Sequence, residues 1–227
     1  MDLKFEFSYK TTPANSFRVK SLKGQYDLED KEVVQTFKGD HKLPANWNVG
    51  LIVGNSGSGK TSIAKEVFGE FSALEWDKKP LIDNFNSKLS MEEITYSLGS
   101  VGFNSVPYWL KPFSVLSNGE KSRVELARMA LEKDLVVYDE FTSLVDRDVA
   151  KSMANSVNKL FKRLNKKLVA VTCHYDVLGW LKPDWVYNTD EKVFFYPKNT
   201  TESNLSLKYI NALTKKEHGN FIKSIII

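Results

Sequence analysis

The stretch that decides the fold is Gly54-Asn55-Ser56-Gly57-Ser58-Gly59-Lys60-Thr61-Ser62, which fits the pattern G-x-x-x-x-G-K-[ST] of a phosphate-binding loop. The apolar run Leu51–Val53 precedes this loop and predicts a buried strand. Apolar residues at helical spacing follow the loop and predict a helix, namely Ile63, Val67, Phe68 and Phe71. A strand, a glycine-rich loop and a helix in this order form the context that the motif requires, which argues against an accidental glycine-rich turn.

Each residue type in the loop suits the binding of a triphosphate. The glycines let the backbone curl so that successive N–H groups point at phosphate oxygens, and the following helix adds the partial positive charge of its N-terminus. We expect Lys60 to reach the β- and γ-phosphates of ATP, and the hydroxyl of Thr61 to bind Mg²⁺. All nine residues from Gly54 to Ser62 are therefore candidates for nucleotide binding.

The overall composition is that of an ordinary globular protein. The 227 residues suffice for one large domain, or for one domain with a small lobe. The net charge of +4 permits an anionic partner without requiring one, and the single cysteine, Cys173, excludes an internal disulfide and fits a reducing compartment. The N-terminus lacks the apolar core of a signal peptide, and no apolar run approaches the roughly 18 residues of a membrane span. We therefore expect a cytoplasmic chain that does not insert into a membrane.

Apolar strands alternate with helical patterns along most of the chain. Leu135–Tyr138 and Leu168–Thr172 read as buried strands, and Asp146 can cap a long amphipathic helix between them. This alternation predicts an α/β fold, with a parallel core sheet covered on both faces. Alternating or clustered β-formers predict an N-terminal antiparallel layer, at Leu3–Tyr9, Phe17–Leu22 and Val33–Phe37, and a late hairpin, at Trp185–Tyr187 and Val193–Tyr196.

A small helical lobe is expected between the phosphate loop and the second half of the sheet. Ser90 and Glu93 form a capping box that opens a short helix through Leu98, and several Gly and Pro residues then break the pattern. The lobe is assigned to residues 72–130, within a domain that spans residues 1–200. Residues 201–227 are polar and weakly periodic, and are assigned to a C-terminal tail.

Two acidic residues follow the predicted strand Leu135–Tyr138. The carboxylate of Asp139 can accept Mg²⁺ directly or through water. Glu140 points differently and could polarise an attacking water beside the γ-phosphate. Taken alone, Asp139 and Glu140 would be read as helix-capping acids, but a phosphate loop in the same chain favours the catalytic interpretation.

His174 ends the next predicted strand, Leu168–Thr172. A single histidine is usually a structural residue, but the carboxyl ends of parallel strands meet at one edge of a sheet, where active sites of α/β folds lie. An imidazole at this position can donate a hydrogen bond to a γ-phosphate oxygen. Cys173 faces the opposite way from its neighbour and is expected to be a buried packing residue.

The turn Leu116-Ser117-Asn118-Gly119-Glu120 opens another helix with a capping box. The serine hydroxyl and the helix N-terminus together form a second candidate anion site. One nucleotide cannot easily occupy two such helix N-termini in one subunit. Two subunits packed head to tail would solve this, because each offers its phosphate loop to one ATP and its serine turn to the other.

The order of these motifs resembles that of the ATP-binding-cassette (ABC) ATPases over residues 15–197. Gly54–Ser62 is similar to the Walker A loop, Leu135–Asp139 to Walker B, and Ser143–Asp146 to the D-loop of the dimer interface. Leu116–Glu120 is similar to the family signature LSGGQ, from which Asn118 and Glu120 depart. The closest resemblance is to soluble ABC-type ATPases, some of which are fused to a predicted acetyltransferase-like domain; it rests on Val115–Arg123, Tyr138–Val149 and Val171–Tyr187.

The resemblance implies a catalytic glutamate at Glu140, a switch histidine at His174 and an ATP-dependent homodimer with two sites at its interface. Ser117, Asn118, Gly119 and Asp146 would then meet the nucleotide held by the other subunit. An adenine-stacking aromatic should precede Walker A, and Tyr26 is the candidate with Phe37 behind it, although either could be a strand core residue. The glutamine-loop residue is not visible, because Gln25 and Gln35 both precede Walker A, and Asp83 or Asn84 is the candidate to replace it near the metal.

Three functions remain open at this level. The first is a soluble ATPase that drives or regulates an unidentified protein or nucleic-acid partner, favoured because transporter subunits usually have a larger lobe. The second is the nucleotide-binding subunit of a transporter. The third is a non-catalytic module that uses ATP as a dimer latch, against which the complete set Lys60, Asp139, Glu140 and His174 argues. A basic cluster could meet phosphates but reads better as a solvated helix face: Lys159, Lys162, Arg163, Lys166 and Lys167.

Overall fold

The computed structural model describes residues 2–11, 16–26, 32–71 and 74–197. By its contacts the chain divides into two compact units, Met1–Lys42 and Leu43–Ile227. The assignment of residues 1–200 to one ABC-type domain, with a reduced lobe at 72–130, stays a prediction. The predicted tail, 201–227, lies outside the described residues.

The first unit is a two-stranded ribbon with a helix between its strands. Strands β1 (Asp2–Thr11) and β2 (Val33–Lys42) pair antiparallel, and helix α1 (Phe17–Tyr26) connects them. Because side chains alternate across a strand, one face carries a row of aromatic rings, among which Phe7 and Phe37 stack with their centroids 5.0 Å apart. The other face carries exposed cross-strand ion pairs, Lys4–Asp40 and Lys38–Glu6.

The prediction of a strand at Phe17–Leu22 is wrong, because these residues lie in α1. Ser16 explains the difference: its carbonyl accepts from the N–H of Lys20 at 3.0 Å, and its hydroxyl accepts from the N–H of Val19 at 3.3 Å. A serine at this position satisfies N–H groups that the first helical turn leaves without partners. The predicted strands at Leu3–Tyr9 and Val33–Phe37 are confirmed as parts of β1 and β2.

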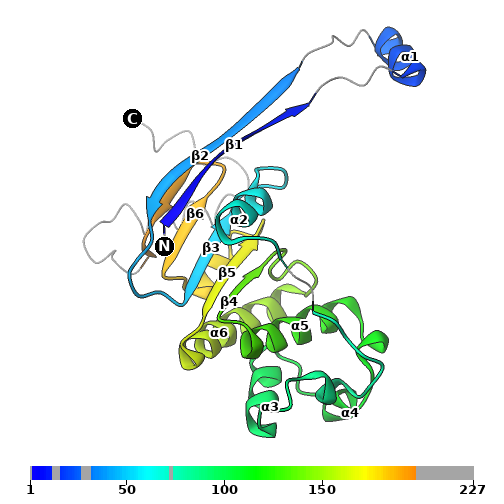
Figure 1. Cartoon of the computed structure of the whole chain (residues 1–227), viewed down its shortest axis with the longest axis vertical. Coiled ribbons are helices and arrows are strands. Elements are labelled where there is room, and N and C mark those ends of the chain that lie inside the picture. Colours follow the sequence, from blue (N-terminus) through cyan, green and yellow to red (C-terminus); the bar gives the residue numbers. More distant parts are fainter. Residues whose placement is uncertain (1, 12–15, 27–31, 72–73, 198–227) are drawn as a thin grey trace. The chain divides into compact units, whose positions relative to one another are not determined.

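The second unit is built on a five-stranded sheet with the order β4-β5-β3-β6-β7 (Figure 1). The four strands β4, β5, β3 and β6 run parallel, and β7 pairs antiparallel with β6 as the predicted hairpin. The parallel α/β core is therefore confirmed. The strands span Leu135–Tyr138 (β4), Lys167–Thr172 (β5), Val49–Val53 (β3), Trp185–Asn188 (β6) and Val193–Phe195 (β7).

Helices pack on both faces of this sheet. Val49, Leu51 and Val53 point into the main core, which they share with α5 (Asn118–Glu132), α6 (Arg147–Leu164) and α7 (Val177–Leu181). The intervening residues of β3 face the other way, towards α2 (Lys60–Phe68), where Phe68 stacks on Trp185 of β6 with the centroids 6.2 Å apart. Continuous burial of β3 on both faces explains why its sequence is uniformly apolar.

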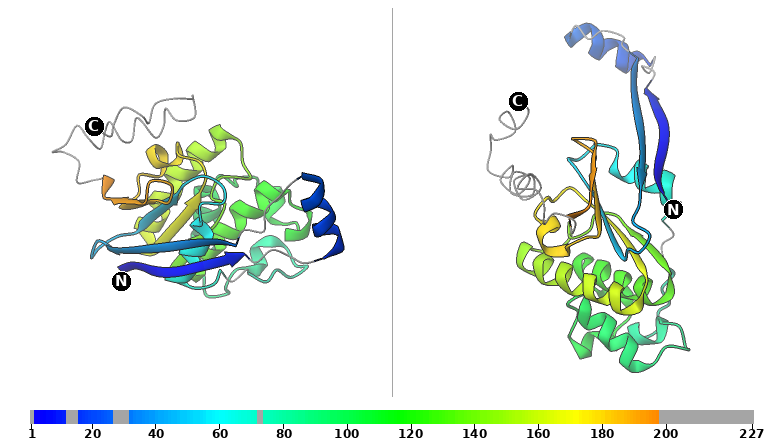
Figure 2. Two further views of the ribbon diagram at one scale, coloured as in Figure 1. Left: turned by 90° about the horizontal axis from the view of Figure 1, so that it is seen from above. Right: turned by 90° about the vertical axis from the view of Figure 1, so that its left-hand side faces the viewer.

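The predicted helical lobe consists of short helices that gather beside α5 (Figures 1 and 2). The principal contact is between α3 and α5, where the buried hydroxyl of Ser97 donates to the carbonyl of Ala127 at 2.9 Å. The rings of Trp76 and Phe113 stack 4.1 Å apart and join the two ends of the lobe. Its helices are η1 (Leu81–Asn84), α3 (Met91–Ser100), α4 (Val106–Trp109) and η2 (Phe113–Val115).

The topology brings three chain segments to one edge of the sheet. Strands β4, β5 and β3 are parallel neighbours, so Asp139, Cys173 and Gly54 leave their strands at the same edge. Ligand sites of α/β folds lie at this edge. Within the described part of the chain, no helix has the length and the apolar character needed to cross a membrane.

Candidate functional site

The phosphate loop lies between β3 and α2, as its sequence predicts. Gly57 and Gly59 have φ angles of 79° and 85°, a left-handed backbone that favours glycine. Lys60 is the first residue of α2 and is 9% exposed, and its Nζ donates to the carbonyl of Asn55 at 2.7 Å. The ammonium group of Lys60 therefore lies against the phosphate loop, near the N-terminus of α2.

Asp139 joins the end of β4 to the phosphate loop. The hydroxyl of Thr61 donates to Oδ2 of Asp139 at 2.8 Å, and the N–H of Glu140 donates to Oδ1 at 2.9 Å. Among the described residues, no group of three or more His, Cys, Asp or Glu side chains could hold a metal by itself. A hydroxyl and one carboxylate suit Mg²⁺ that arrives with a nucleotide, because this ion usually keeps phosphate oxygens and waters as its other ligands.

Glu140 follows in an uncommon backbone conformation. Its φ angle is 52°, and the φ angle of Thr142 is 69°, so the turn holds two non-glycine residues in the left-handed region. Each such residue costs of order 1–3 kcal/mol and is commonest at functional sites. The exposed carboxylate is oriented by Ser143, whose hydroxyl donates to Oε2 of Glu140 at 2.6 Å.

His174 lies beyond the end of β5, the strand between β3 and β4. Its backbone N–H donates to the hydroxyl of Thr172 at 3.2 Å, and its side chain is half-buried. The expectation that Cys173 is a buried packing residue is wrong, since it is also half-buried. Cys173 comes after the last strand residue, where strict alternation between the two faces no longer applies.

The serine turn at the start of α5 is accessible. Ser117 and Asn118 are exposed, and Ser117 forms the predicted capping box with Glu120. The backbone N–H of Ser117 donates to the Glu120 carboxylate and holds the pKa of that carboxyl below its usual value. Gly119 packs closely against the segment that leads to Asp146, because a Cβ at Gly119 would lie 2.7 Å from the carbonyl oxygen of Leu144. The exposed Asp146, two residues further on, caps α6 through the N–H of Val149 at 3.0 Å.

No protein-family model matches the sequence. The chain is 25% identical to the energy-coupling factor transporter ATP-binding protein EcfA1 of Leuconostoc mesenteroides, over 87% of this chain and 89% of the relative. It is 30% identical to the lipoprotein-releasing system ATP-binding protein LolD of Pseudoalteromonas translucida, over 66% of this chain and 60% of the relative. The structure of CbiO1 from Clostridium perfringens, part of the ABC transporter complex CbiONQ, matches with a TM-score of 0.55 at 17% identity, over 77% of this chain and 87% of that chain.

The chain is an ATPase of the ATP-binding-cassette type. The order of motifs along the sequence and the parallel sheet that carries them agree with this assignment.

Two further residues that the ABC resemblance suggested belong to other elements of the chain. Asp83 is exposed on η1, and its place near the metal stays a prediction. Tyr26 is the last residue of α1 and is 64% exposed, so the alternative that it is a strand core residue is wrong. Phe37 lies on β2, stacked on Phe7. Both aromatic candidates belong to the first unit, and adenine stacking by either stays a prediction.

Sequence reasoning missed a further group of residues at the phosphate loop of this ABC ATPase. Asp190 follows β6 and accepts a hydrogen bond from the N–H of Asn55 at 2.9 Å. Thr189 lies beside it, and its hydroxyl is 2.5 Å from the hydroxyl of Ser58. The rule that chemistry gathers at the carboxyl ends of parallel strands could have found both residues, because they follow β6 as Asp139 follows β4.

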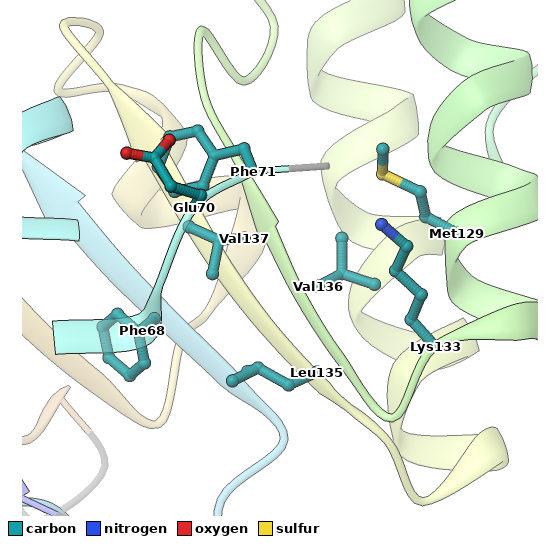
Figure 3. Close-up of a pocket in the computed structure, with 8 residues that line it drawn as sticks. All are labelled: Phe68, Glu70, Phe71, Met129, Lys133, Leu135, Val136 and Val137. Atoms are coloured by element: carbon teal, nitrogen blue, oxygen red, sulfur yellow. The ribbon is translucent and has the colours of Figure 1, made fainter. Parts of the chain in front are cut away.

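A cavity of about 100 Å³ lies at the other end of α2 and is separate from the phosphate loop. Figure 3 shows Phe68 at the end of α2 and Phe71 just after this helix, facing Met129 of α5 and Lys133 just after α5, with Leu135–Val137 of β4 between them. Six of its eight lining residues are apolar, the other two are Glu70 and Lys133, and the volume is small. None of the residues predicted to be catalytic is among its lining residues.

Proposed function

We propose that the chain binds Mg-ATP on Gly54–Ser62 and hydrolyses it at the interface of a head-to-tail homodimer. The observation that supports this best is the 2.8 Å hydrogen bond between Thr61 and Asp139. It brings the last part of the phosphate loop to the carboxylate that ends β4, so that one ion could bind both. Bound Mg²⁺ would neutralise charge on the phosphates, and Thr61 and Asp139 are the residues that would hold it.

The other groups at the edge of the sheet have separate proposed roles. Lys60 would exchange the carbonyl of Asn55 for the β- and γ-phosphate oxygens of ATP. Glu140 would polarise the attacking water through the carboxylate oxygen that Ser143 leaves available. His174 would donate a hydrogen bond to the γ-phosphate. These roles require the groups to act together in a site from which water is largely excluded.

The second half of each site is proposed to come from the partner subunit. Ser117 and Asn118 are exposed at the N-terminus of the 15-residue helix α5, where backbone N–H groups and the helix dipole favour an anion. Gly119 fits against Leu144, which places the serine turn and the segment ending at Asp146 on one surface. A nucleotide held by another copy could therefore meet both.

A transporter is the partner class that the relatives favour. Both relatives described above are named as ATP-binding components of transport or release systems, and neither as an acetyltransferase. The nucleic-acid hypothesis is weakened, because three of the five residues of the basic cluster make contacts within the chain. Lys166 donates to the carbonyl of Leu131, Arg163 lies 4.0 Å from the ring centroid of Tyr96, and Lys167 lies 5.2 Å from that of Trp47.

Calorimetric titration with Mg-ATP, together with assays of phosphate release, tests the proposed site. Lys60→Ala should weaken ATP binding about tenfold or more, because it removes a charged phosphate contact. Lys65→Ala is the matched control, since Lys65 lies on the same helix but is exposed and pairs with Glu70 at 2.9 Å. Unchanged affinity in Lys60→Ala would overturn the role of the loop.

Glu140→Gln separates the enzyme from a non-catalytic ATP latch. The amide cannot act as a base, so phosphate release should fall by about 10²- to 10⁴-fold while ATP affinity is retained. Wild-type protein that binds ATP but releases no phosphate would support the latch instead. Co-purification of the Glu140→Gln protein in ATP with a membrane protein would support the transporter role, whereas co-purification with DNA or RNA would support the nucleic-acid alternative.

A further inference from the structure

We propose that Tyr175 and Asp190 are positioning residues that couple the phosphate loop to His174, so that the state of one is transmitted to the other. This inference rests on the proposed function, because it concerns how two parts of that site act together. Tyr175 adjoins His174 in sequence, and Asp190 adjoins the phosphate loop in space. A hydrogen bond between their side chains joins the two.

Asp190 belongs to the turn after β6, and this turn contacts the phosphate loop. Besides the bond from the N–H of Asn55 to Asp190, the neighbouring Thr189 contacts Ser58 and donates its N–H to the carbonyl of Val53 at 2.9 Å. Gly54 has no room for a side chain, since a Cβ there would lie 2.0 Å from the hydroxyl of Thr189. The turn is therefore in direct contact with the start and the middle of the phosphate loop.

Tyr175 reaches the same carboxylate oxygen from residues 174–176, which lie between β5 and α7 and are called the switch segment here. Its hydroxyl donates to Oδ2 of Asp190, the atom that also accepts from Asn55. The tyrosine is 5% exposed, so its ring is fixed by packing in the main core. A displacement of this oxygen changes two hydrogen bonds at once, one to the loop and one to the residue after His174.

A second anchor holds the other end of the switch segment. Asp176 accepts from Nε of Arg147 at 3.0 Å, and the guanidinium of Arg147 lies 4.9 Å from the ring centroid of Trp180. Arg147 is the first residue of α6, directly after Asp146. His174 is thus followed by two residues that lead in different directions, Tyr175 to the phosphate loop and Asp176 to the proposed dimer surface.

The charge of a bound nucleotide should act on the hydrogen bonds that join Asn55, Asp190 and Tyr175. A triphosphate on the loop brings negative charge towards the Asp190 carboxylate, and like charges at short range repel. The N–H of Asn55 also has a new acceptor when phosphate oxygens arrive. Both effects weaken the hydrogen bond between Asn55 and Asp190 when nucleotide binds. Because Tyr175 bonds the same oxygen of Asp190, it transmits the change to the adjacent His174.

Three variants and one control isolate the link. Asp190→Ala removes both hydrogen bonds, Tyr175→Phe removes only the bond from the switch segment, and Asp190→Asn keeps an oxygen that can accept from both donors. Asp184→Asn is the matched control, because Asp184 likewise accepts backbone N–H groups, those of Asn48 at 2.8 Å and Val49 at 3.0 Å. Those residues lie at the opposite end of β3 from the phosphate loop.

The coupling is measured first without nucleotide, by hydrogen–deuterium exchange of the full chain. Tyr175→Phe should speed exchange in the peptide that contains Asn55, because it removes the hydroxyl that bonds the same oxygen of Asp190. Asp190→Ala should speed exchange in the peptide that contains His174, and Asp190→Asn should restore most of the protection. Asp184→Asn should change neither peptide. Unchanged exchange at Asn55 in Tyr175→Phe would overturn the coupling, whatever the protein does with ATP.

Turnover and ATP affinity then test the role in the site. Tyr175→Phe should lower kcat with little change in ATP affinity, whereas Asp190→Ala should change both. In the double variant that combines Tyr175→Phe with Asp190→Ala, the two effects on kcat should overlap. The loss of kcat calculated by multiplying the two single effects should therefore exceed the measured loss by about threefold or more. Effects that simply multiply would overturn the positioning role. A wild-type chain that fails to bind ATP would instead overturn the proposed function, and is detected separately by calorimetry.

Discussion

Gly119 is the residue at which a single methyl group tests the packing of the site. A Cβ at this position would lie 2.7 Å from the backbone oxygen of Leu144, and a backbone atom cannot yield without moving the segment that leads to Asp146. Gly119→Ala should therefore cost about 1–3 kcal/mol of unfolding free energy, as overpacking does. Urea denaturation measures this loss, and phosphate release should fall with it while ATP affinity is retained.

Gly179→Ala is the control for this substitution. Gly179 lies in α7, where a Cβ would meet no atom within 4 Å. Alanine is the better helix former, so this variant should be as stable as the wild type or slightly more stable. Equal stability and equal turnover in the two variants would show that the contact between Gly119 and Leu144 is unimportant.

At the residue scale, the sequence predicts contacts between residues that belong to recognisable motifs. It misses contacts made by residues outside such motifs. Thr61 and Asp139 lie 78 positions apart, yet both could be placed because the loop motif and the end of an apolar strand each have a known position in an α/β fold. Asn55 and Asp190 are 135 positions apart, and the place of Asp190 just after an apolar strand marks it as a candidate without showing which residue it contacts. Only the strand order, with β6 next to β3, brings them together.

Among the elements, α5 depends on its N-terminal cap. The hydroxyl and the N–H of Ser117 both donate to the Glu120 carboxylate at 2.9 Å. Ser117→Ala should cost about 1 kcal/mol of stability, the usual effect of losing an N-cap serine, and should also lower phosphate release. Ser90→Ala removes the same type of capping box from α3, so it should cost a similar amount without affecting hydrolysis. Equal effects of both variants on hydrolysis would argue against a specific role for Ser117.

The cap of α5 should also be sensitive to acid. The pKa of Glu120 lies below the ordinary value of 4.5, mainly because the backbone N–H of Ser117 donates to the carboxylate. The folded state therefore favours the charged form, so the stabilisation is fully present above pH 4.5 and is lost as the pH falls through the lower, folded-state pKa. Glu120→Gln should lose less stability than the wild type between neutral and acidic pH in urea titrations. An equal loss would show that the cap does not titrate.

Element prediction succeeded where burial sets the pattern and failed where a local cap does. The strands β3, β4 and β5 are buried and have nearly continuous apolar sequences, and helix α6 has apolar residues at helical spacing on its buried face. The segment Phe17–Leu22 alternates apolar and polar residues, but the alternation does not reflect burial. No described side chain of α1 is buried. The capping serine, Ser16, indicates the helix there, and it outweighs a short alternation that buries nothing.

At the scale of the whole molecule, the proposed hydrolysis depends on two copies of the chain that complete each other's sites. The phosphate loop, Asp139, Glu140 and His174 gather at one edge of the sheet, whereas Ser117 and Asp146 begin separate helices and are exposed. Each set is incomplete for hydrolysis in the proposed mechanism. A chain that functioned as a monomer would leave the accessible serine turn without a nucleotide.

The most direct test is the mass of the Glu140→Gln protein in solution, measured by light scattering after size exclusion in the presence of Mg-ATP. Because this variant should bind ATP without hydrolysing it, we predict a species of twice the 25.9 kDa of the chain. The dimer should disappear when ATP is omitted, and also when Lys60→Ala is combined with Glu140→Gln. A protein that binds ATP and still elutes with the mass of one chain would contradict the account.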